Sequence, residues 1–304
     1  MNVALLFPGQ GAQTPGFLHT LPEIECVQKT LVEASNALGF DVLSLDSEPM
    51  SRGTVAVQLS LLIAGTAFAR FVHAEKIVPV AAAGMSVGAF AAAVAASALA
   101  FADALQFVKW RAELMEQAFP DGTHGLAVVE GLQREQLELL LVGRELVLAN
   151  ENALAQFVVV GQTPSLHTIC AVALQAGAHR AELLQIGVPS HTVLLQPAAE
   201  TLSRLAMKIA VSTPAFPLFA NRTARPLISA DKLREDLTWN MAAPVMWRDI
   251  MSAMGELGVD LFLEAPPGHT LGRLAHVNLP EVAAMSAADT RWDVLAKAAR
   301  RTVR

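Results

Sequence analysis

The sequence has 304 residues, of which 53% are hydrophobic and 16% charged, with a net charge of −6 and no long basic run. This length and apolar content predict one large domain or two of ordinary size, and the acidic balance argues against nucleic acid as a partner. The two cysteines, Cys26 and Cys170, lie far apart in no metal-like spacing, which predicts a protein of the reducing cytoplasm without a disulfide framework or a metal site.

The first part of the sequence alternates predicted strands and helices. Its apolar start at Val3–Phe7 lacks the basic segment of a signal peptide and is predicted to be a strand. The next predicted elements are helices at Glu25–Leu38 and Thr54–Val72, a buried strand at Ile77–Ala83, an alanine-rich helix at Ala89–Ala100 and a helix at Asp103–Ala118 capped by Asp103. This order is typical of an α/β fold with a mostly parallel sheet. Small residues and Pro79 in the uncharged run after Ile77 favour a buried helix over a membrane span.

The middle of the sequence follows a different pattern. Its predicted elements are a strand at Gly125–Glu130, a helix at Gln133–Leu141, strands at Leu146–Ala149 and Gln156–Val160, a helix at Pro164–Gln175 and a strand at Arg180–Ile186. The order β-α-β-β-α-β is typical of a ferredoxin-like unit. We therefore expect a ferredoxin-like subdomain at residues 124–189, inserted into an α/β hydrolase-like core formed by residues 1–123 and 190–304.

The segment Gly84-Met85-Ser86-Val87-Gly88 is a Gly-x-Ser-x-Gly motif between a predicted strand and a predicted helix. In this setting the motif is typical of a nucleophile elbow, where a tight turn holds the serine hydroxyl at the start of a helix. Free backbone N–H groups and the helix dipole favour negative charge there. Ser86 is therefore the candidate nucleophile for acyl transfer.

A serine nucleophile needs a base, and the sequence has eight histidines. His191 is the strongest candidate because Val188-Pro189-Ser190-His191 lies in a predicted strand-to-helix loop, where catalytic groups tend to lie. His269 is its rival. No motif supports an acid, so Asp231, Asp236 and Asp249 stay open as triad members, beside a Ser–His dyad oriented by a backbone carbonyl.

Arg111 is unusual because it falls on the apolar stripe of its predicted helix, opposite the polar face. A cation in that position is costly unless it is paired. Two interpretations remain open: a structural ion pair or a snorkelling side chain, and a guanidinium fork for a substrate carboxylate.

The turn Gly9-Gln10-Gly11-Ala12-Gln13 follows the first predicted strand. It lacks the spacing of a phosphate-binding or dinucleotide-binding loop, so a nucleotide site is not expected. Its backbone N–H groups suit the second donor of an oxyanion hole beside Ser86; the alternative is a plain tight turn.

Together these segments resemble the malonyl-CoA:acyl carrier protein transacylase family. The resemblance is carried by Gly9–Gln13, Gly84–Gly88, Trp110-Arg111 with Met115 and Gly122, Val188–His191, Asn221, Pro244-Val245 with Trp247, and Glu264–Gly268. These segments occur in the family's order and span nearly the whole chain. The resemblance implies malonyl-CoA as substrate, the prosthetic thiol of a carrier protein as acceptor, and no tightly bound cofactor or metal.

The resemblance also implies a role for each matching residue. Ser86 would be the nucleophile, His191 its base, and Arg111 the group that holds the malonyl carboxylate. The remaining implied site residues are Gln10 and Val87 as backbone donors to the oxyanion, Asn240 as the residue whose carbonyl orients the histidine, and Asn152 and Gln156 as polar residues close to the cleft.

Met85, Ala89 and Phe90 depart from the elbow that is usual in fatty acid synthesis, which reads Gly-His-Ser-Leu-Gly-Glu. The variant here, with the opening Phe-Pro-Gly-Gln-Gly-Ala-Gln-Thr-Pro-Gly-Phe-Leu, is similar to the epsilon-subunit family of bacterial malonate decarboxylase. This likeness implies an enzyme that charges the decarboxylase's carrier subunit with malonyl and that contacts other decarboxylase subunits.

Several alternatives remain open. One is the transacylase of fatty acid synthesis, and another is a serine thioesterase or esterase that uses water as acceptor. A third is a non-catalytic subunit that docks a carrier protein through the basic C-terminal residues Arg291, Lys297, Arg300, Arg301 and Arg304. Such a basic run is more often a solvated helix face.

Overall fold

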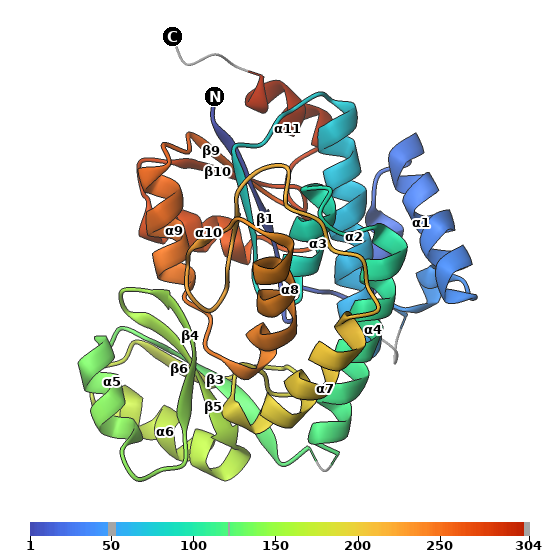
Figure 1. Cartoon of the computed structure of the whole chain (residues 1–304). Helices are drawn as coiled ribbons and strands as arrows, with labels where there is room; N and C mark the ends of the chain where they lie inside the picture. The colour runs from blue at the N-terminus through green and yellow to red at the C-terminus, as the bar shows by residue number, and fades with distance from the viewer. Residues whose placement is uncertain (48–52, 121, 301–304) are drawn as a thin grey trace.

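The computed structural model describes residues 1–47, 53–120 and 122–300. It contains two sheets, each with its own helices, and the chain enters and leaves the smaller part through neighbouring segments (Figure 1). The predicted α/β class with a mostly parallel sheet and a separate antiparallel unit is confirmed.

The larger part is built on a six-stranded sheet in the order β10-β9-β1-β2-β7-β8. Every described pairing in it is parallel except that of β7 with β8. Its strands are β1 Val3–Phe7, β2 Ala81–Gly84, β7 Leu218–Phe219, β8 Pro226–Leu227, β9 Leu261–Glu264 and β10 Ala283–Ser286. Strand β1 lies inside the sheet and is buried along its whole length. The loop that follows it therefore begins at the carboxyl ends of the parallel strands.

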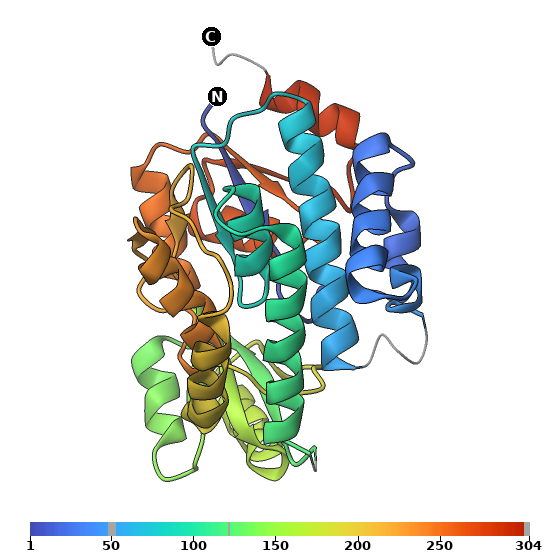
Figure 2. The ribbon, with the colours of Figure 1, turned by 45° about the vertical axis from the view of Figure 1, so that its right-hand side comes forward.

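Helices cover both faces of this sheet, as alternate residues of β1 show. Leu5 and Phe7 belong to the larger apolar core and Leu6 to the core of the opposite face. The helices are α1 Glu25–Leu38, α2 Thr54–Ala74, α3 Gly88–Ala95, α4 Phe101–Ala118, α7 Gln196–Ala206, α8 Ala230–Trp239, α9 Trp247–Glu256, α10 Thr270–Asn278 and α11 Trp292–Ala299, with short 3-10 turns η1 Phe17–Thr20, η2 Val42–Ser44, η4 Val193–Leu195 and η5 Asn240–Ala242. The turned view shows α1, α2 and α4 side by side on one face (Figure 2).

Helix α2 is the one described helix that is long and apolar enough to cross a membrane, with a mean hydropathy of 1.7 over its best window. That window is 89% buried inside the protein. The helix is therefore a core element, packed between α1, α3 and α4.

The smaller part is an antiparallel sheet in the order β4-β5-β3-β6, with α5 and α6 packed on one face. Its elements are β3 His124–Glu130, α5 Arg134–Leu141, β4 Val147–Ala153, β5 Gln156–Gln162, α6 Thr163–Gln175 and β6 Arg180–Leu183. This is the predicted β-α-β-β-α-β sequence, and the strand order is that of a ferredoxin-like unit.

The two parts are joined by backbone hydrogen bonds as well as by the chain. The Glu151 N–H donates to the Val245 carbonyl and the Val245 N–H donates to the Ala149 carbonyl, both at 2.9 Å. The Asn278 side chain donates to the Asn152 carbonyl at 2.9 Å. Strand β4 is thereby fixed to the segment that precedes α9.

Several bounds of the sequence prediction were wrong. The strands predicted at Leu146–Ala149 and Arg180–Ile186 are observed at Val147–Ala153 and Arg180–Leu183, and three further differences follow. Strand β2 begins at Ala81, not at Ile77, because Pro79 has no N–H to donate. The alanine-rich helix ends at Ala95, and Ser97 adopts a left-handed φ of 54° that breaks it. Helix α4 begins at Phe101, so Asp103 lies inside its first turn. Its negative charge there interacts favourably with the helix dipole, but its side chain does not cap the helix.

Candidate active site

The motif at Gly84–Gly88 forms a sharp turn between β2 and α3, with Ser86 at a left-handed φ of 54°. Both glycines are required by close backbone approach. A Cβ on Gly84 would lie 2.0 Å from the Gly88 carbonyl carbon, and one on Gly88 would lie 2.1 Å from the Phe7 oxygen. Strain at a serine in such a turn is typical of a functional position.

The buried side chain of Asn221 braces this turn from the end of β7. Its Oδ1 accepts the Ser86 N–H at 2.8 Å, and its Nδ2 donates to the Gly84 carbonyl at 2.9 Å. Asp236 accepts the Asn221 N–H at 3.2 Å, and burial raises the pKa of Asp236 to about 6. The carboxylate therefore supports the brace and does not contact His191.

His191 is buried, with 3% of its surface exposed and a φ of 63°, and it contacts Asn240, whose Nδ2 donates to the Ser86 carbonyl at 3.4 Å. Its Nδ1 lies 2.7 Å from the Asn240 carbonyl and 3.1 Å from the Ala243 carbonyl. Since carbonyl oxygens only accept hydrogen bonds, Nδ1 carries the proton and Nε2 is left as an acceptor. Burial, and next the charge of Arg111, lower the His191 pKa to about 4, so the ring is neutral at neutral pH.

Arg111 is completely buried on α4, and its guanidinium reaches the hydroxyl of Ser86. Its Nη2 donates to Ser86 Oγ at 2.9 Å and to Asn240 Oδ1 at 3.3 Å, and its Nη1 donates to Gln58 Oε1 at 2.6 Å. Across the described part of the chain no carboxylate pairs with Arg111, and its Nε has no hydrogen-bond partner. Burial lowers its pKa to about 9, which leaves it charged at neutral pH.

The turn after β1 lies against the elbow. The position of a Cβ on Gly9 would be 2.8 Å from the Met85 carbonyl oxygen, so the loop that carries Gln10 packs directly on the residue before Ser86. Val87 is the N-cap of α3. Among the described hydrogen bonds, the N–H groups of Gln10 and Val87 have no acceptor.

The structure does not bring every predicted residue to this site. Gln156 lies at the start of β5, where it donates to Glu130 at 2.8 Å. Asn152 is buried in β4 at the joint between the two parts, and its Oδ1 accepts from the Asn150 side chain at 3.4 Å. Asn150, which the sequence prediction passed over, is the residue of β4 that reaches the elbow, with its Nδ2 at 3.7 Å from the Met85 sulfur.

The rival base and the candidate acids lie elsewhere. His269 is 41% exposed and pairs with Asp289 at 3.0 Å. Asp231 is exposed and pairs with Arg234, and Asp249 lies exposed in the first turn of α9. In the described residues, then, the groups around the His191 ring nitrogen Nδ1 are backbone carbonyls.

Sequence reasoning also missed Gln58 as a site residue. Its signal was available, because Gln58 is a lone amide inside the apolar run that forms α2. A polar side chain in such a run has to find a partner, and its partner is Arg111. The described residues contain no group of His, Cys, Asp or Glu side chains arranged to hold a metal ion.

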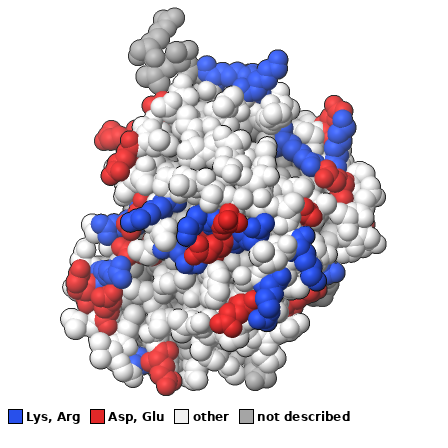
Figure 3. Space-filling model, in the orientation of Figure 1, with Lys and Arg blue, Asp and Glu red and all other residues white. Residues whose placement is uncertain are grey.

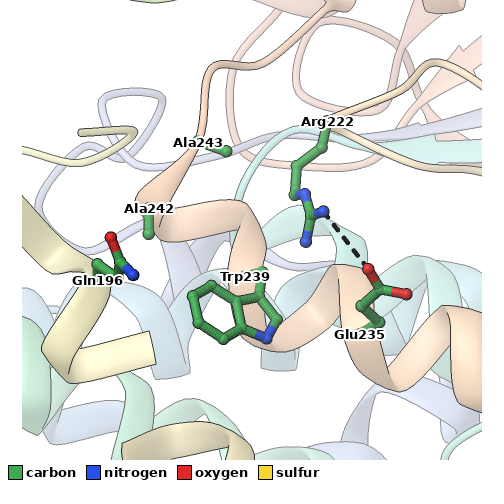
Figure 4. A pocket seen from close by; sticks show the side chains of 6 residues that line it. All are labelled: Gln196, Arg222, Glu235, Trp239, Ala242 and Ala243. Atoms are coloured by element: carbon green, nitrogen blue, oxygen red, sulfur yellow. Dashed lines mark hydrogen bonds and ion pairs between the residues drawn. The ribbon is translucent and has the colours of Figure 1, made fainter. Parts of the chain in front are cut away.

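A pocket of about 360 Å³ opens next to the segment that orients His191. Figure 4 shows Arg222 and Glu235 pointing toward one another on one side of Trp239, with Gln196 and Ala242 on the other side. Ala243, whose carbonyl contacts His191, also lines this pocket. On the same face, charged side chains of both signs gather over α8 and the boundary with the smaller part (Figure 3).

The chain was compared with known proteins. The acyl transferase domain family matches residues 4–290. The malonyl CoA-acyl carrier protein transacylase of Haemophilus influenzae is 33% identical over 94% of this chain and 95% of its own length. The solved transacylase of the same name from Coxiella burnetii superposes with a TM-score of 0.93 at 29% identity, covering 100% of this chain and 98% of that one.

A further solved structure is a malonyl-transacylase in complex with the acyl carrier protein of a type II polyketide synthase. It superposes with a TM-score of 0.89 at 30% identity, and the match covers 97% of this chain and 99% of that chain. These similarities extend over both parts of the fold.

Proposed function

The chain belongs to the acyl transferase domain family, and from that premise we propose that it transfers malonyl from malonyl-CoA to the thiol of an acyl carrier protein through an acyl-serine. The observation that carries the proposal is the Arg111 guanidinium, which is buried without a carboxylate partner in the described residues and lies 2.9 Å from the Ser86 hydroxyl. An acyl group that carries a free carboxylate would supply the missing anion. Its carboxylate would bind the guanidinium while its thioester carbonyl lies at the Ser86 hydroxyl.

In this mechanism Ser86 is the nucleophile and His191 is its base. The neutral imidazole accepts the hydroxyl proton at Nε2 while Nδ1 donates to the Asn240 and Ala243 carbonyls. The Ser86 oxygen bonds to the thioester carbon, the carbon–sulfur bond breaks, and the imidazolium returns the proton to the departing CoA sulfur. Two backbone carbonyls thus orient the ring in place of a triad acid.

We propose the N–H groups of Gln10 and Val87 as the donors to the oxyanion. Support comes from their lack of acceptors in the described residues and from the contact of the Gly9–Gln10 turn with Met85. Removing one such donor typically costs about 3 kcal/mol of transition-state stabilisation. The carrier thiol then attacks the acyl-serine by the reverse path, which is a ping-pong reaction.

We further propose, as a narrower hypothesis, that the acceptor is the carrier subunit of a malonate decarboxylase. It rests on the sequence of the elbow, in which Met85 contacts Asn150 and Phe90 is buried against Phe107 at a centroid distance of 5.0 Å. The relatives described above support the broader hypothesis better, since their names specify acyl carrier protein transacylases without the decarboxylase.

The experiment for the broader hypothesis is intact mass spectrometry after mixing the protein with malonyl-CoA. The parent protein should gain one malonyl group, and Ser86→Ala should gain none. Addition of a purified carrier should move the group to the carrier thiol. An adduct that persists in Ser86→Ala would contradict the nucleophile assignment, and release of free malonate without a carrier would indicate a thioesterase instead.

The narrower hypothesis is tested by the same assay with two purified carriers, one from fatty acid synthesis and one from malonate decarboxylase. It predicts a higher kcat/KM for the decarboxylase carrier. Equal or lower kcat/KM for that carrier would leave the broader function and remove the narrower one.

A further inference from the structure

The hydroxyl of Ser86 is engaged by Arg111. The 2.9 Å hydrogen bond runs from Nη2 to Oγ, so a lone pair of the nucleophilic oxygen points at a cation. No hydrogen bond between His191 Nε2 and Ser86 Oγ occurs among the described contacts. A hydrogen bond from a cation withdraws electron density from the acceptor oxygen and fixes its rotamer, and both effects oppose attack on a thioester.

The guanidinium is held in this position by neutral amide groups. Gln58 Oε1 accepts from Nη1 at 2.6 Å, and Asn240 Oδ1 accepts a second bond from Nη2 at 3.3 Å. The donor Nη2 is therefore shared between Ser86 and Asn240, and Nε has no partner in the described residues. A carboxylate offers two charged acceptors to the same fork and forms stronger hydrogen bonds than an amide or a hydroxyl.

His191 is fixed more firmly than the serine side chain. Its ring is held by two carbonyls and its own N–H donates to the Met241 carbonyl at 2.7 Å. The groups that can change partners are thus the guanidinium and the Ser86 hydroxyl, whose χ1 rotation needs no backbone movement.

We propose that Arg111 is a lock on the nucleophile that the substrate's own carboxylate opens. When a carboxylate takes the guanidinium fork, Oγ is released and can donate to His191 Nε2. Arg111 would then select acyl groups twice, once by binding the carboxylate and once by permitting attack only when a carboxylate is present. The nature of the acyl group rests on the proposed function, but the lock itself needs only a carboxylate.

This role differs from simple carboxylate binding in the step that it affects. Uniform binding of a carboxylate lowers KM and leaves the acylation rate unchanged. A lock makes the chemical step itself dependent on a carboxylate, including one that is not attached to the reacting group.

The test uses phenylmethylsulfonyl fluoride, a neutral reagent, with formate as a free carboxylate. In the reaction the Ser86 oxygen bonds to sulfur, fluoride leaves, and His191 takes the hydroxyl proton. The rate is followed by intact mass, with chloride replacing formate at equal ionic strength. Formate should accelerate sulfonylation of the parent by about tenfold or more, the effect of releasing a charge-assisted hydrogen bond. No acceleration, or protection by formate, would overturn the lock.

Two variants sharpen the result. Arg111→Met keeps the apolar stem without the charge, and it should react as fast without formate as the parent does with it. Arg70→Leu is a matched control, because Arg70 is a partly buried arginine that bonds Thr30 and Glu33 outside the site; it should respond to formate as the parent does. A formate response in Arg111→Met would contradict the proposal.

The test is also separate from the proposed function. If formate accelerates the parent while no carrier accepts malonyl, the lock stands and the transferase proposal falls. If malonyl transfer is efficient but formate has no effect on sulfonylation, the transferase proposal stands and the lock falls.

Discussion

Two buried charges in this molecule are satisfied in opposite ways. Glu151, at the joint between the two parts, has a side chain that is 8% exposed and pairs with Arg134 at 2.6 Å and Arg248 at 3.0 Å. Arg111, in the site, is fully buried and is surrounded by amide and hydroxyl oxygens, with no carboxylate among the described residues. The first charge is fully paired within the protein, and the second is not.

On the function proposed above, the difference separates a structural charge from a functional one. A buried ion is costly unless its partners compensate the lost hydration. The two arginines around Glu151 do so with the protein's own groups, one from each side of the joint. The neutral groups around Arg111 do so only in part, which supports the proposal that the guanidinium binds an anion of the substrate.

Replacing Arg111 should therefore harm activity much more than stability. Arg111→Met should lower the rate of malonyl transfer by about a hundredfold or more, because an oriented charge-assisted contact is lost. Its free energy of unfolding should be equal to or above that of the parent, since a partly compensated buried cation is removed. Urea unfolding and a transfer assay check both. A large loss of stability would place Arg111 with the structural charges.

The pH dependence of the free energy of unfolding tests whether His191 is buried in its neutral form. Its pKa is lowered to about 4 in the folded protein, so the unfolded chain binds the proton more readily. This contribution to stability is complete above about pH 6.5 and is lost as the pH falls toward 4. Between pH 7 and pH 5 the loss in the free energy of unfolding that is due to His191 amounts to about 2 kcal/mol.

The measurement is urea unfolding of the parent and of His191→Asn at pH 7 and pH 5. Asparagine tolerates the left-handed φ and can still donate to the Asn240 carbonyl. The parent should lose about 2 kcal/mol more than the variant on acidification. Asp236 and Glu264, whose pKa values burial raises to about 6 and about 7, act in the opposite direction in both proteins. Equal losses would contradict a neutral buried His191.

Replacing Glu151 should harm stability more than activity, which is the reverse of the effect expected for Arg111. Glu151→Gln keeps the size of the side chain and should lower the free energy of unfolding by about 1–2 kcal/mol. The cost is moderate because Arg134 and Arg248 are 45% and 39% exposed and can turn toward water. Acylation of Ser86 should stay within about threefold of the parent, since the pair touches no catalytic group. A collapse of acylation at unchanged stability would overturn this assignment.

Exposed pairs should matter least. Lys297 and Arg291 both contact Asp293 on the surface of α11, and Arg300 pairs with Glu75; Arg301 and Arg304 lie outside the described residues. Lys297→Ala should change the free energy of unfolding by less than about 0.5 kcal/mol. Its kcat/KM for the carrier should also stay within about twofold if this helix face is merely solvated. A tenfold fall would support carrier docking at the C-terminal helix.

Much of the fold followed from local patterns. The strand-helix order, the β-α-β-β-α-β unit and the elbow depend on periodicity and on glycine at close backbone contacts, as Gly84 and Gly88 show. Element ends were less predictable, because the break at Ser97 comes from a left-handed residue that has no strong sequence signal.

The site was predictable only where a motif marks it. The Arg111 guanidinium donates to the Ser86 hydroxyl. His191 contacts the carbonyl of Asn240, whose side chain bonds both Arg111 and the Ser86 carbonyl, whereas Gln156 lies at another sheet position. Asn221 and Gln58 act through contacts between residues 135 and 53 positions apart. Such contacts depend on tertiary packing, and a single sequence does not specify them.

The most direct measurement is the ratio of malonyl to acetyl acylation rates at Ser86, determined by single-turnover intact mass in the parent and in Arg111→Ala. If Arg111 binds the carboxylate of malonyl as proposed, it has no such group to bind in acetyl, and the ratio should fall by about a hundredfold or more in the variant. An unchanged ratio, with both rates reduced equally, would show that Arg111 does not recognise the carboxylate.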